Sequence, residues 1–155
     1  MQILSDRVHG TCIALGGGAV LLRGPSGSGK SDLALRFIMQ ALGPTAPAGE
    51  CRLVADDQVE LSRAGRQIIA DAPAVLRGKL EVRGLGIIPI GFAGPTPLLG
   101  VVDLVGRTDV DRMPDQGIRI DVLGVPLPTT KLTAFDASAP FKLALFIDFA
   151  AKSVQ

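Results

Sequence analysis

Residues 24–31 form the pattern in this chain that most directly predicts chemistry. They have the spacing G-x-x-x-x-G-K-S, and each position is a candidate for nucleotide binding: Gly24, Pro25, Ser26, Gly27, Ser28, Gly29, Lys30 and Ser31. Glycines let several backbone N–H groups turn toward one anion, and a following helix adds its positive N-terminal end. The Lys30 ammonium can reach the β- and γ-phosphates, and the Ser31 hydroxyl can bind Mg²⁺. The motif therefore predicts a nucleotide site.

Two adjacent carboxylates, Asp56 and Asp57, are the next candidates for chemistry. They follow the short apolar segment 51–55, and ligands of α/β sheets collect where strands end. Phosphoryl transfer needs one carboxylate near Mg²⁺ and, when the target is a hydroxyl, one that accepts its proton. Two adjacent acids could meet both needs, although they face opposite ways in a fully extended strand. By spacing alone, an exposed turn fits the pair equally well.

Hydrophobic spacing predicts the elements that position these residues. Residues 19–22 are continuously apolar and predict the strand before the glycine-rich loop, whereas residues 31–42 have apolar residues at helical spacing. Gly43-Pro44 is expected to end this helix. The remaining expected elements are a strand over 8–14 with a turn at 16–18, a strand over 51–55, two or three short strands over 59–79, a strand and glycine turn over 80–90, strands over 98–104 and 117–125, and a helix over 140–152. The pattern is α/β, with many strands and two helices.

Length and charge limit the class of protein. A chain of 155 residues with 47% hydrophobic residues is predicted to form one domain, residues 1–155, with a substantial core. Its net charge of +1 argues against a nucleic-acid partner or a membrane-surface protein. No stretch predicts a membrane-spanning helix, and the first residues do not resemble a signal peptide.

Three groups of residues allow further predictions: the cysteines, the aromatic residues and the single histidine. Cys12 and Cys51 are too few for a disulfide framework, which favours buried thiols in a reducing cytoplasm. The chain has no Trp or Tyr and six Phe, so few side chains could stack on a base. Adenine recognition is therefore predicted to be loose or built from aliphatic side chains. The only histidine, His9, stands near a strand start, where a histidine is usually structural.

Four segments occur in an order that resembles a known family. They are His9-Gly10, the loop 24–31, Leu53-Val54-Ala55-Asp56-Asp57, and Leu80-Glu81-Val82-Arg83-Gly84-Leu85-Gly86-Ile87-Ile88. Together they resemble the catalytic domain of bacterial HPr kinase/phosphorylase, from about His9 to about Ala151. The last segment is the most specific, because an ordinary P-loop ATPase lacks it. The resemblance implies an α/β P-loop kinase domain of the HPr kinase and phosphoenolpyruvate carboxykinase-like type, with a mixed sheet and few helices.

The resemblance also implies an activity and roles for residues. It implies an ATP- and Mg²⁺-dependent cytoplasmic kinase that phosphorylates a serine of the phosphocarrier protein HPr and that assembles as a hexamer. Ser31 and Glu81 would hold the cation, and either Asp56 or Asp57 would be the base. The other implied active-site residues are His9, Lys30, Arg83 and Arg112.

The chain departs from the family pattern in three places. Full-length members have an additional N-terminal domain, whereas eight residues precede His9 here, and residues 43–50 look like an insertion. Residues 130–140 correspond to a basic, glycine-containing loop linked to the reverse reaction, the removal of phosphate from HPr by inorganic phosphate. This chain has one lysine and no arginine there, so an anion meets less positive charge. The pattern thus favours the kinase direction over phosphorolysis.

Two other functions are compatible with the glycine-rich loop. A small-metabolite kinase or carboxykinase-like enzyme would need basic clusters for an acidic substrate, and the sequence is poor in them. A non-catalytic nucleotide sensor would not need Asp56, Asp57, Glu81 and Arg112, all of which are present.

Overall fold

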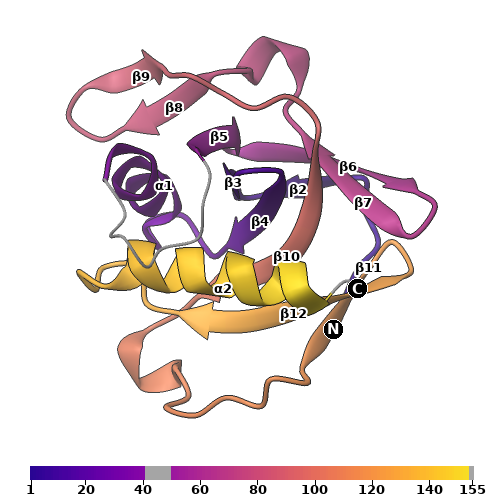
Figure 1. Ribbon diagram of the computed structural model, residues 1–155. Helices are drawn as coiled ribbons and strands as arrows, with labels where there is room; N and C mark the ends of the chain where they lie inside the picture. Colours follow the sequence, from indigo (N-terminus) through magenta and orange to yellow (C-terminus); the bar gives the residue numbers. More distant parts are fainter. Residues whose placement is uncertain (41–49, 154–155) are drawn as a thin grey trace.

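The computed structural model of the protein describes residues 1–40 and 50–153, shown in Figure 1. The strands are β1 (Gln2–Ile3), β2 (Arg7–His9), β3 (Thr11–Leu15), β4 (Gly18–Arg23), β5 (Cys51–Ala55), β6 (Gln58–Ala64), β7 (Gln67–Asp71), β8 (Lys79–Val82), β9 (Gly86–Pro89), β10 (Thr96–Leu104), β11 (Arg119–Val122) and β12 (Val125–Leu132). The α-helices in this part are α1 (Lys30–Met39) and α2 (Ala139–Ser153), and short 3₁₀ turns lie at Ala74–Leu76 and Arg107–Asp109. Neither α-helix is long and apolar enough to cross a bilayer.

The main sheet is mixed, as the sequence predicts. Its strand order is β1-β11-β12-β10-β4-β3-β5, with β10 parallel to both β4 and β12 and with β3 antiparallel to β4 and β5. The first part of β10 pairs with β7, which continues the sheet through β6 to β2. Strands β8 and β9 form a separate antiparallel hairpin, which lies above α1 in Figure 1. The predicted mixed α/β fold is confirmed.

The central strands are buried on both faces. Ile13, Val20 and Leu22 pack under α1 and α2, which contact each other on one face of the sheet. Their neighbours Cys12 and Leu21 point to the other face, where β6, β7, β11 and β12 close a second apolar cluster. Because both faces are covered, β4 reads as a continuous apolar run rather than an alternating one.

The chain changes sheet partners at Gly10, between β2 and β3. β2 pairs with β6, whereas β3 pairs with β4 and β5. A Cβ at Gly10 would lie 2.7 Å from the carbonyl oxygen of Leu22 and 2.9 Å from a methyl carbon of Leu21. Only glycine lets the strand cross so close to β4. The single strand predicted over residues 8–14 is therefore two strands with different partners.

The expectation of one strand over residues 117–125 is wrong. These residues contain β11 and the start of β12, joined by a turn at Leu123-Gly124, where φ is +50° and +87°. Pro126 and Pro128 obscured the second strand in the sequence, because proline cannot donate to a ladder. Residues two apart in a strand direct their backbone N positions to the same side, and the Thr129 N–H donates to Ile118 on the β11 side. The nitrogens of Pro126 and Pro128 therefore face the β10 side, where β12 pairs with β10 only from Thr129 onward, so no ladder hydrogen bond is lost.

Other boundaries differ by small amounts. Helix α1 ends at Met39, and the predicted end at Gly43-Pro44 and most of the apparent insertion lie outside the described residues. β10 begins at Thr96 instead of residue 98, and β1 has no counterpart in the prediction. The region 59–79 contains two strands and a 3₁₀ turn, and the terminal helix is longer by one residue at each end.

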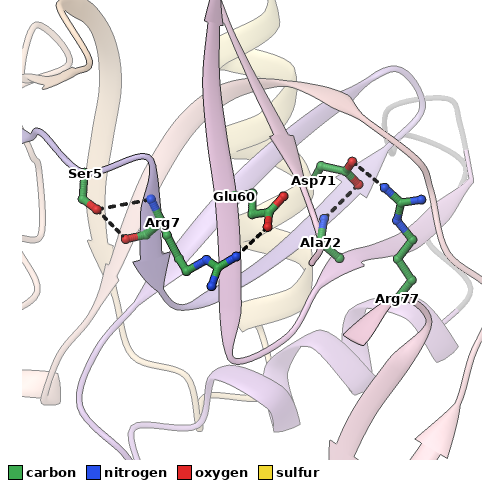
Figure 2. A network of polar contacts seen from close by, with 6 residues as sticks. All are labelled: Ser5, Arg7, Glu60, Asp71, Ala72 and Arg77. Atoms are coloured by element: carbon green, nitrogen blue, oxygen red, sulfur yellow. Dashed lines mark hydrogen bonds and ion pairs between the residues drawn. The ribbon is translucent and has the colours of Figure 1, made fainter. Parts of the chain in front are cut away.

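Polar contacts fix the strands and connections that surround the site (Figure 2). Arg7 of β2 donates to Glu60 of β6 at 2.8 Å, and Ser5 exchanges hydrogen bonds with the backbone of Arg7. At the end of β7, the Asp71 carboxylate accepts from the backbone N–H of Ala72 and from the Arg77 guanidinium, each at 2.8 Å. Exposed pairs of this kind add little stability. The contacts of Asp71 with Ala72 and Arg77 lie within the connection from β7 to the β8–β9 hairpin.

Candidate active site

The glycine-rich loop, residues 24–31, joins the end of β4 to the start of α1. Gly29 is the N-cap of α1 with φ +93°, and Gly27 has φ +82°, so both use backbone conformations that other residues adopt at a cost. No side chain caps the helix. The free N–H groups of its first turn therefore face the cleft, where an anion could satisfy them.

Lys30 is folded back against this loop. Its ammonium donates to the carbonyl oxygens of Gly24 at 2.7 Å and Pro25 at 3.0 Å, and the residue is 8% exposed. Burial lowers the pKa of Lys30, while Asp56 and Asp57 act in the opposite direction by stabilising its charged form. The result is a cation already held at the loop, with two backbone oxygens that a phosphate could replace.

Asp56 is a buried carboxylate with a complete set of donors. It follows β5 and is 6% exposed. Its oxygens accept from the Thr11 hydroxyl at 2.8 Å, from the Ser31 hydroxyl at 2.9 and 3.1 Å, and from the backbone N–H of Glu81 at 3.0 Å. These donors come from β3, α1 and β8. Asp56 thus ties the glycine-rich loop to the central sheet and to the β8–β9 hairpin.

Asp57 has a different environment, although it is the next residue. Its φ of +70° is a left-handed conformation, and it turns the side chain out of the strand direction so that it is 64% exposed. The Nδ1 atom of His9 lies 3.4 Å from Asp57 Oδ1, and the Gly10 N–H donates to the Asp57 carbonyl at 3.1 Å. The structure therefore separates the two acids, one buried against the loop and one open to solvent beside the histidine.

A single cleft of about 390 Å³ brings most of the predicted residues together. Its lining includes His9, Ser26, Gly27, Gly29, Lys30, Ser31, Asp56, Asp57, Glu81 and Arg83. Gly24, Pro25 and Ser28 belong to the same loop but do not line the cleft. Arg112 also lies outside it, in the exposed segment 111–117. Glu81 and Arg83 reach the cleft from the end of β8 and the turn that follows it.

Five further lining residues had not been singled out as site residues in the sequence: Thr11, Asp32, Leu35, Val82 and Phe135. Thr11 reaches Asp56 because β3 lies beside β5, and the sequence does not reveal that non-local pairing. Phe135 follows β12, which the prolines concealed. The other three have local signals: Asp32 and Leu35 lie in the helix predicted after the glycine-rich loop, and Val82 lies between Glu81 and Arg83 in a recognisable segment.

The donor set suits a hard divalent cation with few protein ligands. Within residues 1–40 and 50–153, no three His, Cys, Asp or Glu side chains gather as a metal-binding group. Mg²⁺ commonly uses one or two carboxylates and otherwise keeps waters and phosphate oxygens. Asp56, the Ser31 hydroxyl and Glu81 all line the cleft and provide oxygen donors of this kind.

The Gly29→Ala variant is expected to lose more stability than Gly27→Ala. A methyl group at Gly29 would lie 2.8 Å from Ala134 Cβ and 3.0 Å from the Phe135 ring, whereas Gly27 faces open space. The left-handed backbone alone costs about 1–2 kcal/mol at either position, and only Gly29 adds a collision. Urea unfolding measures the difference, with Gly17→Ala as the control because a Cβ there meets nothing within 4 Å. Equal stability of the Gly29→Ala and Gly17→Ala proteins would contradict this account.

Comparisons with known proteins identify the family of the chain. Residues 3–93 match the family model for the HPr Serine kinase C-terminal domain, which is more than half of the chain. The chain belongs to this family. It is 38% identical over 157 residues to an HPr kinase/phosphorylase of Bordetella pertussis, with 94% of this chain and 47% of that protein covered. It is 36% identical over 164 residues to the protein of the same name from Burkholderia lata, covering 98% and 47%.

The chain spans about half the length of these curated relatives. Among solved structures, the Hpr(Ser) kinase/phosphatase from Coxiella burnetii superposes with a TM-score of 0.76, covering 97% of this chain and 99% of that one at 20% identity. This likeness supports the fold. The family membership also confirms the resemblance inferred from the four sequence segments.

Proposed function

We propose that this chain is an ATP- and Mg²⁺-dependent protein kinase domain that phosphorylates a serine of an HPr-type phosphocarrier protein. The observation that carries the proposal is the different environment of two adjacent carboxylates in one cleft. Asp56 is buried and accepts a hydrogen bond from the Ser31 hydroxyl, whereas Asp57 is exposed beside His9. A kinase for a hydroxyl needs these two environments, one for the metal side and one for the base.

Nucleotide binding is assigned to the glycine-rich loop, which has the P-loop sequence. The backbone of residues 24–31 would surround the phosphates, and Lys30 would give up its contacts with Gly24 and Pro25 to reach them. Ser31, Asp56 and Glu81 would hold Mg²⁺, directly or through water. When bound, Mg²⁺ neutralises charge on the β- and γ-phosphates.

Phosphoryl transfer is assigned to the open end of the cleft. The Asp57 carboxylate takes the proton from the serine hydroxyl as the serine oxygen bonds to the γ-phosphorus. The bond from that phosphorus to the β,γ-bridging oxygen breaks, and its electron pair leaves on ADP. His9 positions Asp57, and Lys30 stabilises the negative charge on the transferred group. Arg83 also lines the cleft and is exposed, so it is available to an anionic group on the protein substrate.

The kinase direction is favoured over phosphorolysis by the loop at residues 133–138. Arg36 donates to the carbonyl oxygens of Ala134 and Asp136, and Arg107 pairs with the Asp136 carboxylate. Each of these guanidinium groups is also paired with a carboxylate, Arg36 with Asp32 at 3.0 Å and Arg107 with Asp136, so they add little net positive charge for inorganic phosphate. We also propose a cytoplasmic location, a homo-oligomeric (hexameric) state and a role for Arg112 in the assembled enzyme. These three proposals rest on the family resemblance.

The test is a transfer assay with γ-labelled ATP, Mg²⁺ and purified HPr, with HPr Ser→Ala as the matched control. We expect label on wild-type HPr only, and none when Mg²⁺ is omitted. Label on a small metabolite in place of HPr would favour a metabolite kinase. ATP binding without transfer to any acceptor would favour a nucleotide sensor, and either result would overturn the proposal.

A further inference from the structure

Phe135 occupies an unusual place at the rim of the cleft. It is 66% exposed, and its ring edge packs on Gly29, where a Cβ would lie 3.0 Å from two ring carbons. Among the described residues that line the cleft, it is the only Phe, Tyr or Trp, and the one other aromatic ring, the His9 imidazole, lies beside Asp57. A single exposed apolar side chain on a protein surface needs no special explanation. This one lies directly over Gly29, the last glycine of the loop, so a ligand bound at the loop would lie beside its ring.

The backbone that carries Phe135 is held firmly on both sides. The Arg36 guanidinium donates to the carbonyl oxygens of Ala134 and Asp136, the two neighbours of Phe135 in the chain. Ala134 is buried, and the Asp136 carboxylate is paired with Arg107. The exposed ring therefore stands on an anchored support, which reduces the entropy that a stacking partner would have to overcome.

The sheet order places Phe135 and Asp57 on opposite sides of the glycine-rich loop. Counting from β4, which leads into the loop, Asp57 follows β5 on one side and Phe135 follows β12 on the other. If Asp57 faces the γ-phosphate, the nucleoside must extend away from it, across the first turn of α1. Ser31 contacts Asp56 on the β5 side of the loop, whereas Gly29 contacts Phe135 on the β12 side, so a nucleoside that extends away from Asp57 would extend toward Phe135.

From this juxtaposition we infer that Phe135 is the stacking platform for the nucleobase. The inference rests on the proposed function and adds the subsite for the base, for which the sequence offers few aromatic candidates. The ligand class is a planar heterocycle joined to a di- or triphosphate. Stacking on a phenyl face tolerates any base, so the contribution of Phe135 should be similar for ATP and GTP.

The experiment compares ATP with tripolyphosphate, which has the phosphates but no base. Phe135→Ala is expected to weaken ATP binding by about fivefold to 100-fold, while tripolyphosphate binding stays within about twofold of wild type. Phe141→Ala is the matched control, since Phe141 is also exposed, at 41%, but lies on α2 away from the cleft. It should bind both ligands as the wild type does.

Phe135→Trp gives a second, direct readout. The chain has no tryptophan, so the fluorescence of the new indole reports this position alone. We expect wild-type ATP affinity and an emission change with ATP that tripolyphosphate does not produce. If wild type binds ATP but Phe135→Ala binds it equally well, or loses both ligands in proportion, the stacking role is wrong and the proposed function stands. If wild type binds neither ligand, the proposed function falls together with this inference.

Discussion

Asp57→Asn is expected to lower the rate of serine phosphorylation by about 10²- to 10⁴-fold while ATP affinity stays within about twofold of wild type. The amide cannot take the serine proton, but it has the shape of the carboxylate. Asn also tolerates the left-handed backbone at this position, where φ is +70°, so the variant should fold normally. Single-turnover transfer to HPr and equilibrium ATP binding measure the two quantities separately.

Asp56→Asn is the matched variant for this experiment. Its side chain is buried and accepts from Thr11, Ser31 and the backbone of Glu81. The amide has one acceptor oxygen in place of two, and its NH2 group can be satisfied only if the Thr11 and Ser31 hydroxyls turn to accept from it. We expect weaker Mg²⁺-dependent ATP binding and lower thermal stability, in addition to lost transfer. If Asp57→Asn retained wild-type turnover while Asp56→Asn bound ATP normally without turnover, the assignments of metal ligand and base would have to be exchanged.

Lys30→Met is expected to reduce transfer by about 10²- to 10³-fold or more, because a positive charge that stabilises the transferred group is lost. The ATP-free protein should nevertheless keep its stability. Burial lowers the pKa of Lys30, so folding disfavours its charged form, and removing the charge offsets the two lost hydrogen bonds. For the same reason, the contribution of Lys30 to stability should improve as pH rises from the folded pKa toward the ordinary lysine value.

Thermal unfolding and the transfer assay check this prediction together. Lys142→Met is the control, because Lys142 is exposed on α2 and does not line the cleft. The control should have wild-type activity. A Lys30→Met protein that transfers phosphate at the wild-type rate would contradict the role of Lys30. A Lys30→Met protein that unfolds well below the wild-type temperature would contradict the prediction that this substitution leaves stability unchanged.

Local patterns were sufficient to predict the elements closest to the glycine-rich loop. The apolar run before residue 24 and the helical spacing after it match β4 and α1, and the strand before Asp56 is β5. These segments carry their own signals: β4 is buried on both faces and is continuously apolar, whereas α1 is buried on one face and has apolar residues at helical spacing. The sequence left open how Asp56 and Asp57 differ. Their difference depends on a left-handed φ at Asp57 and on the packing of β3 beside β5, and neither has a local signature.

The part of the cleft beyond the motif depended on long-range pairing. β12 contains Pro126 and Pro128, and proline argues against a strand in the sequence. Only the structure shows that β12 does not yet pair with β10 at these two residues. Without β12, the position of Phe135 over Gly29 could not be inferred. Arg112 illustrates the opposite case, since the family pattern includes it but the structure of one chain leaves it outside the cleft.

The crossing at Gly10 separates the cleft into two mechanically distinct halves. Thr11, on the β3 side, is tied through Asp56 to the phosphate loop, whereas His9, on the β2 side, belongs to the outer ladder with β6. Asp57 directly precedes β6 and accepts from the Gly10 N–H, so substitutions that tilt the outer ladder would move His9 and Asp57 together, while Asp56 keeps its contacts with Thr11 and Ser31. Under the proposed function, substitutions in the outer ladder would therefore change turnover more than nucleotide affinity.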